Sequence, residues 1–164
     1  MNSFVEEHRN LHRQLMEAMD NIRILLTPER LSIPLNNKAA HRMLCHFVKL
    51  VKTHLYSEHH NRLSVLMPHQ NDWVKSLVCR FGDGEMAIYQ FFDNYHKTFL
   101  KKRRFDFSSN FLAETLDMFD RLERHIHIEE CTLFPTLEVF SQSASRPRPH
   151  GNIVVDANNT CHFA

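Results

Sequence analysis

Two short segments of the chain share one pattern, in which a histidine is followed four residues later by a glutamate. The segments are His54–Glu58 and His125–Glu129. Each lies near the C-terminal end of a stretch whose apolar residues recur at helical spacing. Residues four apart lie on the same face of an α-helix, one turn apart. The pattern therefore predicts two helices that each present an imidazole and a carboxylate from the face that carries their apolar side chains.

Apolar spacing near 3.6 residues predicts four helices, over about 3–26, 37–67, 72–101 and 109–140. Ser3 is placed to cap the first helix, and Pro68 is expected to end the second. The third is either one kinked helix or two pieces, because Gly82 and Gly84 interrupt it, and we place the longest connection around 68–83. Pro135 is expected to bend or end the fourth. These elements predict an all-α, up-down-up-down four-helix bundle over 1–140 with a C-terminal tail over 141–164.

Composition excludes several classes of protein. A formal net charge of +1 argues against a nucleic-acid or membrane partner recognised by charge alone. No apolar run reaches the roughly 20 residues that a membrane-spanning helix needs. The N-terminal residues lack the layout of a signal peptide, so we expect a cytoplasmic protein. Four scattered cysteines without a C-x-x-C pair predict neither a disulfide framework nor a zinc knuckle.

The ionisable residues within the apolar stripes need an explanation, because a buried glutamate without a partner is very costly. A metal ion is one such partner. A mixture of imidazole and carboxylate ligands suits non-haem iron or manganese, although the sequence does not exclude zinc. Glu130, which adjoins Glu129, is either solvated or a hydrogen-bond partner of a ligand histidine.

Counting residues from a connecting loop predicts which residues of two antiparallel helices lie at the same level. If the first loop is centred near Leu31, His8 is level with the pair His54 and Glu58. His12 then lies about one turn, roughly 5–6 Å, nearer the loop. We therefore expect His8 to be a ligand and His12 to lie beside the site or at the surface.

The same count applied to the last two helices places Glu85 level with His125 and Glu129. His96 falls roughly three turns from that level, despite being a common ligand type. Tyr89, one turn from Glu85, is placed to line the same cavity. The count therefore favours Glu85 as the ligand from the third helix.

Three segments resemble the hemerythrin-like family in its His/Glu cation-binding form. They are Glu7–His12, His54–Glu58 and His125–Pro135, the last being close to the family's H-I-x-x-E-E-x-x-L-F-P ending. The resemblance covers about residues 4–140. It implies an up-down four-helix bundle with a non-haem di-iron centre between the helices.

The resemblance also implies a set of ligands. They are His8, His54, Glu58, His125 and Glu129, with the two glutamates bridging the metals. The third helix of the family normally provides a histidine, whereas this chain has Glu85 at the corresponding height. Either Glu85 or Tyr89 takes that role, or His96 does through a shifted register.

The function implied is that of a di-iron protein that binds or senses dioxygen, nitric oxide, peroxide or iron itself. One alternative is a di-iron oxidoreductase that consumes peroxide or nitric oxide. Another is a regulatory module in which the metal site controls binding of a protein partner.

Overall fold

The computed structural model describes residues 3–66, 72–101 and 108–144, and every regular element within them is helical. The α-helices are α1 (Ser3–Arg23), α2 (Pro28–Leu31), α3 (Pro34–Leu66), α4 (Asp72–Tyr95), α5 (Ser109–Ile128) and α6 (Phe134–Ala144). Two π-helical segments continue α4 and α5, namely η1 (His96–Leu100) and η2 (Glu129–Leu133). The all-α prediction is confirmed for these residues. Pro68 and most of the predicted tail lie outside them.

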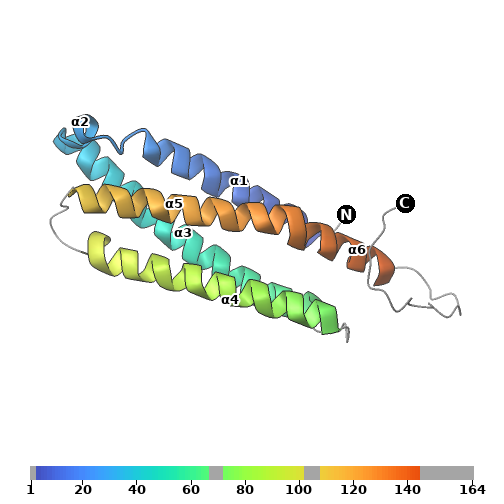
Figure 1. Cartoon of the computed structure of the whole chain (residues 1–164). Coiled ribbons are helices and arrows are strands. Elements are labelled where there is room, and N and C mark those ends of the chain that lie inside the picture. Colours follow the sequence, from blue (N-terminus) through green and yellow to red (C-terminus); the bar gives the residue numbers. More distant parts are fainter. Residues whose placement is uncertain (1–2, 67–71, 102–107, 145–164) are drawn as a thin grey trace, which may run out of the picture.

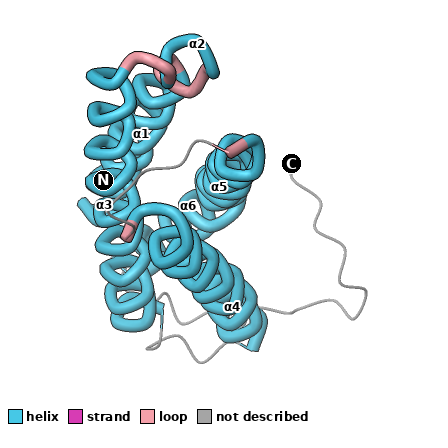
Figure 2. The backbone as a smooth tube through the Cα atoms, turned by 90° about the vertical axis from the view of Figure 1, so that its left-hand side faces the viewer, coloured by secondary structure: helices cyan, strands magenta, loops and turns pink. Residues whose placement is uncertain are grey.

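The long helices alternate in direction along the chain, as Figure 1 shows for α1, α3, α4 and the continuous stretch from α5 to α6. Contacts join α1 to α3, α3 to α4 and α4 to α5, and α1 also contacts α5 and α6. Figure 2 shows α1 beside α3, with α5 across the bundle from α3. The four long stretches thus enclose a shared interior.

Side-chain caps and prolines explain where several helices begin. The Thr27 side chain accepts a hydrogen bond from the Arg30 amide at the start of α2, and Ser108 accepts one from the Phe111 amide at the start of α5. Pro34 is the first residue of α3, where its missing N–H costs no helical hydrogen bond. The second long helix therefore begins at Pro34 rather than near residue 37. The short helix α2 was not predicted.

The helix α4 runs without a break through Gly82 and Gly84. The prediction of a long connection around 68–83 is therefore wrong, because α4 already begins at Asp72. A glycine inside a helix costs only about 1 kcal/mol relative to alanine. Packing of the apolar residues on either side overrides that cost.

The wide π turn η2 ends at Leu133, two residues before Pro135. A proline within a helix has no N–H to donate, and its ring collides with the carbonyl four residues earlier. A π turn is one of the recognised adjustments at such a point. The helical stretch therefore continues past Pro135 to Ala144, rather than ending there.

Within the described part of the chain, buried apolar side chains form two separate clusters. The large cluster extends from the α2 end of the molecule and includes Leu15, Phe47, Phe92 and Phe119. The small cluster consists of Val5, Leu77, Phe81, Leu133, Phe134 and Leu137. Along α1, α4 and the α5–η2 stretch, the chain passes from one cluster to the other. The residues between the clusters form a polar layer.

None of the described helices combines the length and hydropathy needed to cross a lipid bilayer. Among the described residues, Cys45, Cys79 and Cys131 are free thiols, in agreement with the absence of a predicted disulfide framework.

Candidate metal centre

The polar layer contains buried ionisable side chains from every long helical stretch. They are His8, His12, His54, Glu85, His125 and Glu129. Each is at most 7% exposed, and Glu129 is fully buried. Burial of carboxylates together with imidazoles requires mutual neutralisation or a cation.

Five of these residues form two groups that share one member. His12, His54 and Glu129 form the first group, and Glu85, His125 and Glu129 form the second. Within each group the ligand atoms all lie within 4.8 Å of one another. The structure therefore contains buried His/Glu groups that could hold a metal ion, with Glu129 common to both.

The two oxygen atoms of the Glu129 carboxylate face different groups. Its Oε2 lies 3.3 Å from Nε2 of His12, and its Oε1 lies 3.1 Å from Nε2 of His125. Glu129 is the first residue of η2, so the π turn begins at the shared carboxylate. π-Helical insertions are frequent at functional sites.

The ring of His12 is oriented by its other nitrogen. Nδ1 lies 2.8 Å from Oε1 of Glu130, and Arg9 donates to the second oxygen of Glu130 at 3.2 Å. The imidazole also stacks on Phe134, with ring centroids 5.3 Å apart and planes 12° from parallel. These contacts direct Nε2 toward Glu129. A carboxylate on the outer nitrogen is the usual support of a metal-binding histidine.

His54 is held in its neutral form, the form of imidazole that can bind a metal. Burial, reinforced by the nearby His12, lowers the pKa of His54 to about 3. The His54 ring centroid lies 5.1 Å from that of His12 and 5.7 Å from that of His8. His54 is therefore neutral at physiological pH, and only a neutral imidazole has a lone pair for a metal.

The donor set fits a divalent first-row transition metal. Imidazole nitrogen and carboxylate oxygen are the ligand types such ions prefer when no thiolate is present. Nε2 of His125 is buried and makes no hydrogen bond within the described part of the chain. It faces a Glu129 oxygen instead, so both atoms are placed to share a cation.

The structure does not place His12 at the surface. His12 is 2% exposed and belongs to the first group, whereas His8, although buried, belongs to neither. The residue count assumed that the chain reverses at Leu31. Figure 1 shows α2 at the end of the bundle where the chain turns, and α3 begins only at Pro34, so the connection is not the simple loop that the count assumed. The spacing of His8 and His12, again four residues, was the available signal for His12.

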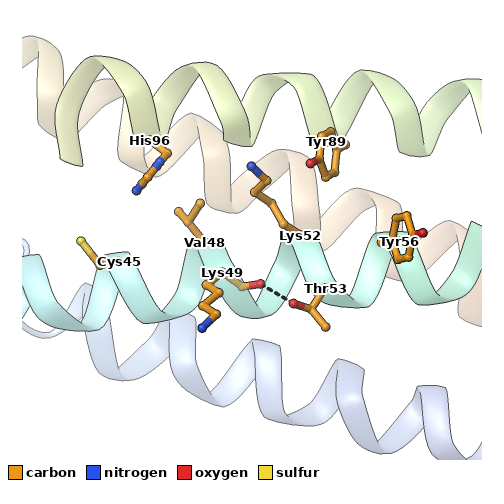
Figure 3. Close-up of a pocket in the computed structure, with 8 residues that line it drawn as sticks. All are labelled: Cys45, Val48, Lys49, Lys52, Thr53, Tyr56, Tyr89 and His96. Atoms are coloured by element: carbon orange, nitrogen blue, oxygen red, sulfur yellow. Dashed lines mark hydrogen bonds between the residues drawn. The ribbon is translucent and has the colours of Figure 1, made fainter. Parts of the chain in front are cut away.

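The structure distinguishes Glu85 from Tyr89 and His96, the other two candidates for the ligand from the third helix. Glu85 joins His125 and Glu129. Tyr89 and His96 instead line a groove of about 460 Å³ between α3 and α4, as Figure 3 shows. The side chain of Glu58 lies outside the described part of the structure, so its predicted role stays a prediction.

No family model, no curated protein and no solved structure matches the chain. What can be said about its function therefore depends on the residues of the polar layer.

Proposed function

We propose that this protein is a hemerythrin-like four-helix bundle with a non-haem di-iron centre that binds dioxygen or a related small oxidant. The observation that carries the proposal is the position of Glu129, which belongs to both buried His/Glu groups. A carboxylate common to two ligand groups is what a pair of bridged metal ions requires. The alternating long helices and their shared interior support the up-down-up-down bundle.

The five residues of the two His/Glu groups have distinct roles in this proposal. His12 and His54 would hold one metal, Glu85 and His125 would hold the other, and Glu129 would be a ligand common to both. When bound, two ferrous ions supply two electrons to dioxygen, nitric oxide or peroxide. The aromatic ring of Phe134 and the two apolar clusters limit the access of water, and Glu130 keeps the ligand nitrogen of His12 directed inward.

A di-iron oxidoreductase is the second candidate, and the carboxylate of Glu85 favours it. The resembled family has a histidine at this position of the third helix. An additional anionic ligand stabilises the more highly charged oxidised metals. The site would then favour oxidation chemistry over reversible binding of dioxygen.

Metal analysis of the purified full-length protein tests the proposal. We expect two iron ions per chain and an optical spectrum that changes when the reduced protein meets dioxygen. Glu129→Gln should lower the content of both metals, whereas Glu138→Gln, a matched change outside the two groups, should leave it unchanged. Recovery of the reduced spectrum when dioxygen is removed would indicate reversible binding, and its absence would indicate the oxidoreductase. Absence of bound iron, or tight binding of zinc alone, would contradict both.

A further inference from the structure

A groove runs along the seam between α4 and α5 and reaches the polar layer at His125. It consists of two adjoining hollows of about 390 and 450 Å³, both lined by Gly84, His125 and Ile128. One hollow continues along Ile88 and Phe91. The other continues toward the start of α4. The combined volume is within the range of sites for small molecules.

The wall of this groove, which we call the α4–α5 groove, is mostly apolar. Its larger apolar side chains are Trp73, Leu77, Phe81, Ile88, Phe91 and Ile128. Trp73 is 52% exposed and Ile128 is 50% exposed, so two large apolar side chains meet solvent along it. An exposed apolar surface arranged in a hollow favours an apolar ligand.

Gly84 keeps the middle of the groove open. A Cβ atom placed on Gly84 would meet nothing within 4 Å. The position is inside a helix, where alanine would be preferred by about 1 kcal/mol. Since neither close packing nor backbone conformation requires glycine here, the absent side chain leaves space in the groove, one residue before the buried Glu85.

The polar part of the lining is cationic. Arg80 on α4 lines one hollow, and Arg121 and Arg124 on α5 line the other. Arg121 is paired with Asp117 at 2.8 Å. Arg124 donates to the backbone carbonyl of Asp120, and within the described part of the chain neither Arg80 nor Arg124 forms an ion pair with a carboxylate. Two exposed guanidinium groups are thus available to an anion.

We propose that the α4–α5 groove binds an apolar monocarboxylate, such as a medium-chain fatty acid. Its hydrocarbon chain would lie along the apolar wall, and Arg80 or Arg124 would pair with its carboxylate. Binding itself depends only on protein side chains. The meaning of a site beside His125 rests on the proposed function, in which His125 binds a metal ion.

The groove between α3 and α4 in Figure 3 is a weaker candidate. Its Lys52 pairs with Asp93 at 2.7 Å, so one of its two lysines is already neutralised. None of the residues that line it belongs to the two His/Glu groups. Its exposed Lys49 provides a control position for charge removal.

Calorimetric titration of the full-length protein with decanoate, below its micelle concentration, tests the proposal. Decanol and decyltrimethylammonium serve as uncharged and cationic probes of the same chain length. We expect decanoate to bind one site at least tenfold more tightly than either. The double variant Arg80→Gln/Arg124→Gln should weaken decanoate at least tenfold and leave decanol unchanged. Lys49→Gln should change neither.

Gly84→Leu tests the position of the ligand. The added side chain should fill the groove and abolish decanoate binding, while circular dichroism and the melting temperature show an intact helical fold. If Gly84→Leu binds decanoate normally, or if the double arginine variant does, the proposal is wrong. A native dimer that Gly84→Leu converts to monomers would also overturn it, because the groove would then be an interface between copies.

Metal content, measured on the same samples, separates the two proposals. Decanoate binding by protein that takes up no iron would retain the ligand site and refute the di-iron function. Normal iron content in protein that does not bind decanoate would retain the di-iron function and refute the ligand site.

Discussion

His12 and Glu130 are joined by a contact of 2.8 Å between Nδ1 and a carboxylate oxygen. Arg9 holds this carboxylate at 3.2 Å and also donates to Glu138 at 2.8 Å. One arginine thus holds two glutamates, but only Glu130 contacts a residue of the buried groups. The two glutamates therefore form a matched pair for testing what supports His12.

Glu130→Gln should lower metal affinity about 10- to 100-fold, as loss of the partner of a ligand histidine typically does. Glu138→Gln should change the affinity little, because Glu138 does not contact His12. Competition with a chelator of known affinity gives the measurement. Equal effects of the two changes would show that Glu130 acts only through Arg9.

Metal stoichiometry should depend on which group is altered. Glu129→Gln should remove both metals, because Glu129 belongs to both groups. Glu85→Gln and His12→Ala should each reduce the occupancy of one metal, because each belongs to one group. Elemental analysis of the purified variants measures this. Two metals retained by Glu129→Gln would contradict the assignment of the bridging residue.

It could be predicted from the sequence that Glu85 lies level with His125 and Glu129 along the bundle, because α4 stays helical through its glycines. One unbroken helix makes the count of residues a reliable measure of height. The count on α1 favoured His8, whereas the structure groups His12 with His54 and Glu129, because the connection contains the short helix α2. Neither Thr27 nor Pro28, which start α2, shows how far the connection extends before it turns.

The general fold could be predicted from apolar periodicity, since each long helix buries one face. The π turns could not. A π turn, whose hydrogen bonds join residue i to residue i+5, is rare and occurs mostly as a single turn inside an α-helix, so apolar spacing near 3.6 residues does not reveal it. The burial of Glu129, Leu133, Phe134 and Leu137 depends on the register that η2 sets.

In the metal-free protein, the free energy of unfolding should fall as the pH is lowered from about 6.5 toward about 3. The pKa of His54 is 6.5 in its ordinary state and about 3 in the folded protein, mainly because the side chain is buried. Between these values the unfolded chain binds a proton that the folded chain does not. This residue then contributes a slope of at most about 1.4 kcal/mol per pH unit.

His54→Gln removes that proton and should flatten the decline relative to the wild type. Urea unfolding at a series of pH values, with a chelator present throughout, compares the two proteins. Parallel profiles would show that His54 binds protons equally in both states.

Tyr95, Thr115 and the Phe111 carbonyl form a buried hydrogen-bond chain beside the large apolar cluster. Substitutions of Tyr95 and Thr115 should lower the free energy of unfolding by different amounts. Thr115 donates its only hydroxyl hydrogen to the Phe111 carbonyl at 2.6 Å, so it accepts from Tyr95 at 2.7 Å. Tyr95→Phe removes the donor and should cost about 1 kcal/mol. Thr115→Val leaves the Tyr95 hydroxyl buried without its acceptor and should cost about 1–3 kcal/mol.

Urea denaturation of both variants and of the double variant checks this order. The double variant should lose less stability than the two single losses together, because no hydroxyl remains without a partner. A larger loss in Tyr95→Phe than in Thr115→Val would reverse the assignment of donor and acceptor.

The unequal sizes of the two apolar clusters imply that the ends of the molecule open on different timescales. Amide hydrogens beside the small cluster, around Val5 and Leu137, should exchange with solvent sooner than those beside Leu15 and Phe47, because fewer buried contacts must separate. The polar layer lies at the boundary. Segmental opening of the end that carries α6 would expose it while the large cluster stays intact, so a metal ion held there could enter and leave without global unfolding.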